Sequence, residues 1–192
     1  MTRNRCWLLL LFVVASICVL AVGAYRLSPA RTVGRTLQLD AVTQKVFAQA
    51  VRVDVFRLAD FHEGNRSVEE YGAIGQNKYG TVNDYTLTRR GVQQNAVFAG
   101  KLLSALQKVG DPAKYFPASC FDPGVGFRVW HSREHTDIFV CFYCSGVDIS
   151  TTDAHGHIVW QTRTDLGEAR SSLLALSRQV FPDDKALQQL KG

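Results

Sequence analysis

The sequence predicts an α+β domain in which amphipathic helices pack on one face of a mostly antiparallel sheet, preceded by one apolar membrane segment. Two stretches have helical periodicity, one near residues 92–109 and one after residue 165. Between them lie four short segments of β-branched or aromatic residues, and turn-forming residues separate these segments from one another. Such an order is typical of a sheet meander flanked by helices. The apolar segment is an uncharged run at the amino end.

The apolar run covers residues 6–24, directly after Arg3 and Arg5. A spanning helix needs about 20 residues with a lower limit near 17, whereas the apolar core of a secretory signal has about 7 to 15. The 19 uncharged residues therefore predict a retained signal anchor within residues 1–24. Cleavage near Ala24 is the alternative, because Val22-Gly23-Ala24 offers the small residues that a signal peptidase reads.

The charges divide the chain into a basic amino end and a neutral body. Of the 22 Lys and Arg residues, five arginines precede residue 37 with no acid among them, which leaves 17 basic and 17 acidic residues behind. A nucleic-acid surface needs clustered cations, so we expect no nucleic-acid partner. Residues 25–36, around Pro29, are expected to be a basic linker and residues 37–192 a single domain.

The short tail ahead of the apolar run favours a signal anchor that contacts the membrane through residues 6–24 and presents the domain outside the cytoplasm. The arginines on the two flanks are balanced and do not decide the orientation. A protein secreted after cleavage, and a domain that faces the cytoplasm, are the alternatives.

The first part of the domain alternates between helix and strand patterns. Leu39, Val42, Val46 and Ala50 recur every three or four residues and predict a helix within 37–50. The alternation of apolar and charged residues in 51–58 predicts a strand with one solvent-exposed face. Residues 60–78 are polar and predict a loop, and residues 79–88 predict a strand or hairpin arm.

Residues 92–109 are the clearest helix, with Leu103 and Leu106 in the middle of its apolar stripe and Gly110 and Pro112 as its stop. Gly100 inside it costs about 1 kcal/mol relative to Ala, which predicts close packing at that point.

The segments 126–131, 137–142, 146–151 and 157–160 predict the meander. A last helix is expected from Asp165, which resembles a capping box with Glu168. Its face is Leu166, Ala169, Leu173, Leu176 and Val180, and it ends at Phe181-Pro182.

Cys120 with "FDPGVGFR", then "DIFVCFYC" and the final helix closing in "FP", resembles a family of uncharacterised small bacterial proteins with a cysteine before a proline turn and a C-F-x-C strand. The resemblance implies an α+β fold and a bacterial origin. It implies no activity, and the apolar amino end is not part of it.

Cys141 and Cys144 form a C-x-x-C spacing that fits several structures. With Cys120 and one of four histidines, listed last, they form a candidate zinc site; a thioredoxin-like pair is disfavoured because no helix follows. In an exported domain Cys120 could instead form a disulfide with either cysteine. We expect Cys141 to be buried in the sheet and Cys144 to be more accessible in a turn. The histidines are His131, His135, His155 and His157.

The stretch "DAHGH" contains Asp153, His155 and His157 at a period of two, which suits metal chelation by one side of an extended chain. The same residues provide the turn chemistry of a hairpin, and this interpretation is favoured.

Two functions follow from these patterns. The first is a membrane-tethered, non-enzymatic domain of the cell envelope that binds a protein or another envelope component, and this is the expectation. The alternative is a thiol- or zinc-dependent protein centred on Cys120, Cys141 and Cys144, with His155 and His157 as further metal candidates.

Overall fold

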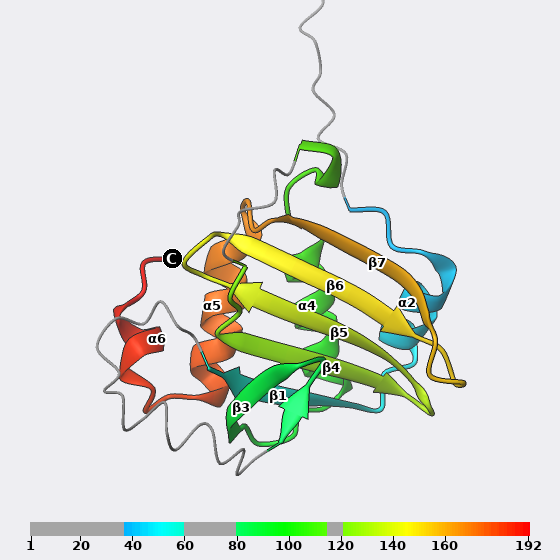
Figure 1. The fold of residues 1–192 in the computed structure, drawn as a ribbon, viewed down its shortest axis with the longest axis horizontal. Coiled ribbons are helices and arrows are strands. Elements are labelled where there is room, and N and C mark those ends of the chain that lie inside the picture. The colour runs from blue at the N-terminus through cyan, green and yellow to red at the C-terminus, as the bar shows by residue number, and fades with distance from the viewer. Residues whose placement is uncertain (1–36, 60–79, 115–120) are drawn as a thin grey trace, which may run out of the picture. The chain divides into compact units, whose positions relative to one another are not determined.

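Strands from both halves of the domain form one curled antiparallel sheet, a half-barrel, with the order β2-β3-β1-β4-β5-β6-β7 (Figure 1). The computed structural model describes residues 37–59, 80–114 and 121–192. The strands are β1 (Arg52–Leu58), β2 (Thr81–Val82), β3 (Tyr85–Arg90), β4 (Val125–His131), β5 (Glu134–Cys141), β6 (Gly146–Thr152) and β7 (Ile158–Asp165). The helices are α2 (Ala41–Ala48), α4 (Ala96–Leu106), α5 (Ala169–Val180), α6 (Lys185–Gln189) and the short 3-10 helix η1 (Pro112–Lys114).

The predicted meander is confirmed as β4 to β7, in which each strand pairs with the next one along the chain. Short turns join the strands, and Ser132 and Ser145 adopt positive φ angles of 54° and 52° in the first two of them. The last strand is longer than predicted, because the polar stretch 161–165 continues the ladder to β6. The polar residues fit there since β7 has β6 as its only neighbour in the sheet order.

Alternation along the strands sorts their side chains onto two faces. Val53 of β1 lies opposite Val129 of β4, and this row continues through Thr136 and Thr151 to Trp160. We call this side, which the helices cover, the inner face. The neighbouring row begins with Asp54 and belongs to the other side, the outer face.

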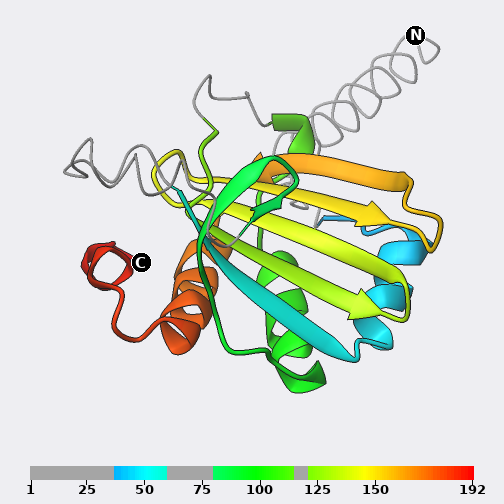
Figure 2. The same ribbon diagram turned by 60° about the horizontal axis from the view of Figure 1, so that its bottom comes forward.

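Helices α2, α4 and α5 lie on the inner face, as the sequence predicts (Figure 2). The main core lies between them and the sheet, and it includes Val46, Val55, Leu102, Leu106, Phe127, Ile138, Ile149, Leu173 and Leu174. The hydroxyl of Thr43 on α2 also reaches that of Thr151 on β6 at 2.5 Å. This bond pairs two fully buried polar groups, which would otherwise destabilise the core.

The β2–β3 hairpin folds over the outer face. Asn83 and Asp84 form its turn with φ angles of 46° and 68°, as a type I′ turn requires. Val82 and Leu87 pack with Phe139 in a second, smaller core on that side of the sheet. The predicted strand or hairpin arm in 79–88 is therefore a hairpin.

Helix α4 differs from its prediction in its start and in its buried face. The side chain of Asn95 accepts hydrogen bonds from the N–H groups of Val97 and Phe98, so the helix begins at Ala96. Leu102 and Leu106 are fully buried, whereas Leu103 lies at the border of the core. The prediction at Gly100 is wrong, since beyond its chain neighbours and the backbone of its own helix no described atom lies within 4 Å of where a Cβ would be.

The predicted face is buried, with Ala169, Leu173, Leu176 and Val180 on α5 and Leu166 just before the helix. The predicted capping box is wrong: Asp165 is the last residue of β7, and Glu168 at the cap makes no side-chain hydrogen bond. Gly167, with φ of 46°, turns the chain between strand and helix instead.

The short helix α6 was not predicted, and a buried cation connects it to the sheet. Arg57 is 3% exposed, and its Nε donates to Oδ2 of Asp184 at 2.8 Å while its Nη1 donates to the carbonyl of Gly124 at 2.6 Å. Asp184 also accepts from the N–H of Leu187 and caps the helix. A buried charge with these partners is compensated.

In the described part of the chain, no helix is long and apolar enough to cross a membrane. The predicted anchor in residues 1–24, the linker 25–36, the loop 60–78 and Cys120 lie outside the described residues.

Candidate functional site

The C-x-x-C sequence lies in the turn between β5 and β6. Cys141 ends β5, pairs with Gly146 and is fully buried, while Cys144 in the turn is partly exposed. Both predictions about exposure are confirmed. The N–H of Cys144 donates to the Cys141 sulfur at 3.2 Å, and both thiols are free.

Burial raises the pKa of Cys144 to about 12, and a hydrogen bond with Cys141 and the charge of Cys141 add to this effect. Hydrogen bonds from the N–H groups of Gly146 and Asp122 lower the pKa, but they do not outweigh burial. At neutral pH the thiol therefore keeps its proton, and nucleophilic chemistry by Cys144 is unfavourable.

The meander separates this turn from the four histidines that were candidates for a zinc site. His131 and His135 lie at the β4–β5 turn, and His155 and His157 at the β6–β7 turn, which are both at the other end of the sheet. The seven residues of β6, at about 3.3 Å each, place the two ends about 20 Å apart. Among the described residues no group of three or more His, Cys, Asp or Glu side chains could hold a metal ion.

The "DAHGH" stretch forms the turn between β6 and β7, so the hairpin interpretation that the sequence favours is confirmed. Oδ1 of Asp153 accepts the N–H groups of His155 and His157, each at 2.9 Å, and Gly156 adopts a φ of 88°. The hydrogen bond from the His157 N–H is the main reason why the pKa of Asp153 lies below its ordinary value. The carboxylate thus shapes the turn.

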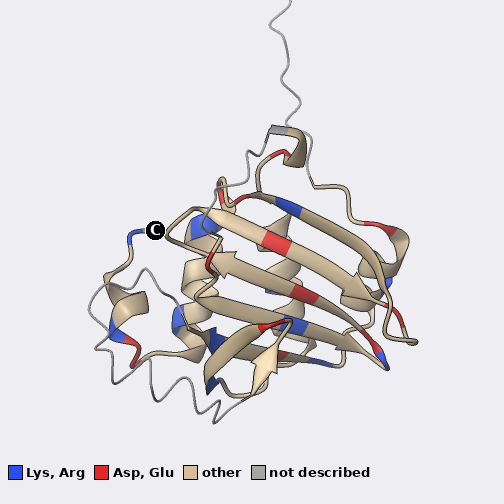
Figure 3. Cartoon of the chain, in the orientation of Figure 1, with Lys and Arg blue, Asp and Glu red and all other residues tan. Residues whose placement is uncertain are grey.

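On the outer face, oppositely charged side chains form pairs across neighbouring strands (Figure 3). Nε and Nη2 of Arg128 donate to the two oxygens of Asp137 at 2.6 and 2.8 Å, and Asn83 of the hairpin donates to the same carboxylate at 2.9 Å. Burial raises the pKa of Asp137, but the hydrogen bonds from Arg128 and His135 outweigh it, so the pKa is lower than usual. These groups satisfy one another and stabilise the face.

Strand β7 forms one edge of the sheet, and part of its backbone is open. The carbonyl of Asp165 accepts the N–H of Gly110, which places it on the side away from β6. By alternation, the N–H and C=O of Gln161 point to the same side. No described residue pairs with them.

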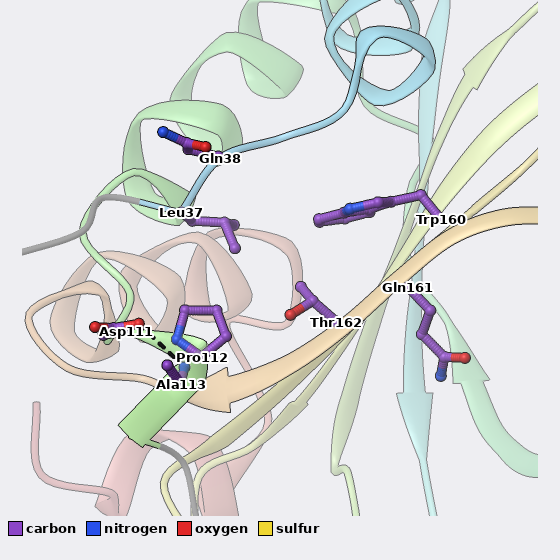
Figure 4. A pocket seen from close by; sticks show the side chains of 8 residues that line it. All are labelled: Leu37, Gln38, Asp111, Pro112, Ala113, Trp160, Gln161 and Thr162. Atoms are coloured by element: carbon purple, nitrogen blue, oxygen red, sulfur yellow. Dashed lines mark hydrogen bonds between the residues drawn. The ribbon is translucent and has the colours of Figure 1, made fainter.

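The sheet is hollowed on the inner side of this edge. A groove of about 450 Å³ lies between β7, η1 and the start of the domain. Figure 4 shows the side chains of Leu37, Pro112, Trp160 and Thr162 around the groove, and that of Gln161 on the other side of the strand. The lining is mixed, because Gln38, Asp111, Gln161 and Thr162 join the apolar Leu37, Pro112, Ala113 and Trp160.

A second hollow, of about 390 Å³, lies on the outer side of the same edge. Ile158, Gln161 and Arg163 of β7 line it together with Tyr85, whose ring packs on Phe139 at 4.9 Å between centroids. Nε2 of Gln161 donates to Asp148 at 3.2 Å, and Arg163 forms an ion pair with the same carboxylate. The two hollows therefore flank one open strand edge.

The chain matches no known family model, and it shows no significant similarity to a curated protein or to a solved structure.

Sequence reasoning did not identify the edge of β7 as a site. The pattern in 157–160 predicts only an ordinary strand, whereas Ile158 and Val159 are 61% and 45% exposed. Two exposed β-branched residues beside the polar stretch 161–165, with one Arg and neither Lys nor Pro, are the signal that an edge strand lacks protection.

Proposed function

We propose that the protein is a membrane-tethered, non-enzymatic binding domain that captures an extended segment of a partner protein by strand addition to β7. The segment would lie along Ile158–Arg163, form main-chain hydrogen bonds with Gln161, and extend the sheet by one strand. The observation that carries this proposal is the open N–H and C=O of Gln161 in the edge strand β7, between two hollows.

The hollows indicate what kind of segment fits. In an added strand, alternate side chains point to opposite faces of the sheet. One set would enter the groove beside Leu37, Pro112 and Trp160, which suits apolar side chains. The other set would enter the hollow beside Tyr85 and Gln161, which suits polar ones. The expected ligand is therefore a segment that alternates apolar and polar residues.

Exposed side chains at the edge support binding further. Ile158 and Val159 lie at the amino end of β7, next to the β6–β7 turn. Burying an aliphatic side chain stabilises a complex by about 25 cal/mol per Å² of apolar surface. Apolar contact and main-chain pairing together account for affinity without a catalytic group.

The tether is part of the same proposal. Residues 6–24 would remain as a membrane anchor and hold the domain outside the cytoplasm, where envelope proteins are the available partners. A reporter that is active only after export, fused at Gly192, should be active in a bacterial host. Activity of a cytoplasmic reporter at that position would contradict the orientation.

The binding test uses a phage-displayed library of random dodecapeptides, selected on the immobilised full-length chain in mild detergent. Two variants are compared with the wild type. Gln161→Pro removes the open N–H, and an edge strand tolerates proline where its N–H faces away from the ladder. Gln161→Ala is the matched control, because it also loses the side chain but keeps the N–H.

We expect the enriched peptides to alternate apolar and polar residues, to bind the Gln161→Ala variant, and to bind the Gln161→Pro variant at least tenfold more weakly. Equal binding to both variants would contradict strand addition. A dimer in light scattering that Gln161→Pro dissociates would mean that a second copy of the chain occupies the edge, and the proposal would be wrong.

A further inference from the structure

The turn between β5 and β6 arranges two sulfur atoms and several hydrogen-bond donors in a way that the strand-addition site does not use. Residues 142–145 connect the paired residues Cys141 and Gly146, and Ser145 directly after the second cysteine has a φ of 52°. This left-handed residue reverses the chain, which lets both cysteine side chains approach each other. The hydrogen bond between the two thiols follows from this approach.

Backbone N–H groups point to both sulfur atoms. The N–H of Cys144 donates to Cys141 at 3.2 Å, and those of Gly146 and Asp122 are directed at Cys144. The sulfur of a protonated thiol is a weak acceptor, whereas hydrogen bonds to a charged acceptor are about twice as strong as those between neutral groups. In the free protein, burial outweighs the donors to Cys144 and the thiol keeps its proton. A metal ion that displaces the protons would turn both sulfurs into charged acceptors and strengthen all three hydrogen bonds.

A cation is fixed at the same turn. Nη1 of Arg170 on α5 donates to the carbonyl of Phe142 at 2.6 Å and to Oγ of Ser145 at 3.3 Å. These bonds hold its guanidinium against the turn that carries both cysteines. The buried surroundings, with Cys141 and Phe142 at 0% and 3% exposure, keep water away from one side of the pair.

We propose that Cys141 and Cys144 together bind one soft d10 metal ion of the Cu⁺ class as a two-thiolate chelate. Soft thiolates select such ions. Zinc is almost always bound by four ligands in structural sites, and the described residues supply no third protein ligand at this turn. On binding, each S–H bond is replaced by a sulfur–metal bond and both protons pass to solvent, so the bound unit carries one negative charge.

The site is distinct from the open edge, because the turn joins β5 to β6 and Gln161 lies on β7. The release of protons on binding also makes the affinity for the metal ion depend on pH. While both thiols are protonated, the affinity should rise by about tenfold per pH unit for each proton released.

The test is a competition titration of Cu⁺ against bathocuproine disulfonate, with the reduced full-length chain in mild detergent under anaerobic conditions. We expect one Cu⁺ per chain for the wild type. Cys144→Ser and Cys141→Ser should each weaken binding at least 100-fold, and Cys120→Ser is the control that should change it less than threefold. Because Cys141 is buried, Cys144→Ser decides the outcome if Cys141→Ser fails to fold.

Three results would overturn the proposal. One is the lack of stoichiometric Cu⁺ binding by the reduced wild type. Another is a loss in Cys120→Ser equal to that in Cys144→Ser, which would mean a three-thiolate site. The third is preference for Zn²⁺ over Cu⁺ when both ions are offered at equal free concentration.

Discussion

The centre of the core beneath α4 is Leu102, and replacing it with alanine tests this assignment. Leu102 is fully buried among residues of the helices and the sheet, whereas its neighbour Leu103 lies at the border of the core. The substitution removes three carbon atoms, which at about 0.8 kcal/mol each gives about 2.4 kcal/mol of lost transfer free energy. The cavity that remains raises the expected cost to about 3 to 4 kcal/mol.

Leu103→Ala removes the same three carbons from a partly exposed position, so it should cost less than about 1.5 kcal/mol. The assay is urea unfolding of the full-length chain in mild detergent, followed by tryptophan fluorescence, with the free energy of unfolding compared at equal slope. Equal costs for the two variants, or a cost below about 1 kcal/mol for Leu102→Ala, would refute the assigned face of α4.

Three more predictions concern glycines, a buried carboxylate and the thiols. Gly100→Ala should stabilise the fold by about 0.5 to 1 kcal/mol in urea unfolding, because the position is helical and open, whereas Gly110→Ala should destabilise it, because the new methyl collides with the Asp165 carboxylate. Because the pKa of Asp137 is lowered, its ionised form stabilises the fold fully above about pH 4, the ordinary range of the unfolded carboxyl, and this contribution is lost as the pH falls through the folded pKa. The difference in the free energy of unfolding between the wild type and Asp137→Asn should therefore become smaller below pH 4. A difference that stays constant with pH would contradict the assignment. Iodoacetamide at pH 7.5 should label both thiols slowly, Cys144 before Cys141, and rapid labelling of Cys141 in peptide mass mapping would disagree with its burial.

Local patterns predicted the meander and the buried face of α5 well. Segments such as 126–131 and 146–151 combine β-branched residues with turn residues on both sides, and these preferences act within a few positions of the chain. The stripe from Leu166 to Val180 has a helical period that no alternative explains.

Helix starts were less predictable, because capping depends on backbone geometry. Asp165 and Glu168 have the spacing of a capping box, yet β7 continues to Asp165 by pairing with Gly146. At α4, Asn95 caps the helix, although the apolar pattern extends back to Val92. In both places a tertiary or local hydrogen bond overrode the periodicity.

The candidate site depends on strand order, which the sequence pattern does not specify. β1 inserts beside β4, although Val53 and Val129 are far apart in the chain, and this order leaves β7 at the edge. The hairpin that brings Asn83 to Asp137 likewise joins distant segments. The cysteine turn was predictable in part, since its spacing is local, but the donors around it come from three separate backbone positions.

Amide hydrogen exchange at Gln161 tests the open edge of β7 most directly. In the full-length chain without a partner, the N–H of Gln161 should exchange with solvent at least 100-fold faster than that of Ile149, which lies in the interior strand β6. A selected strand-forming peptide should slow the exchange at Gln161 and leave Ile149 unchanged. Protection of Gln161 equal to that of Ile149 in the protein alone would mean that the edge is already covered, and would contradict strand addition.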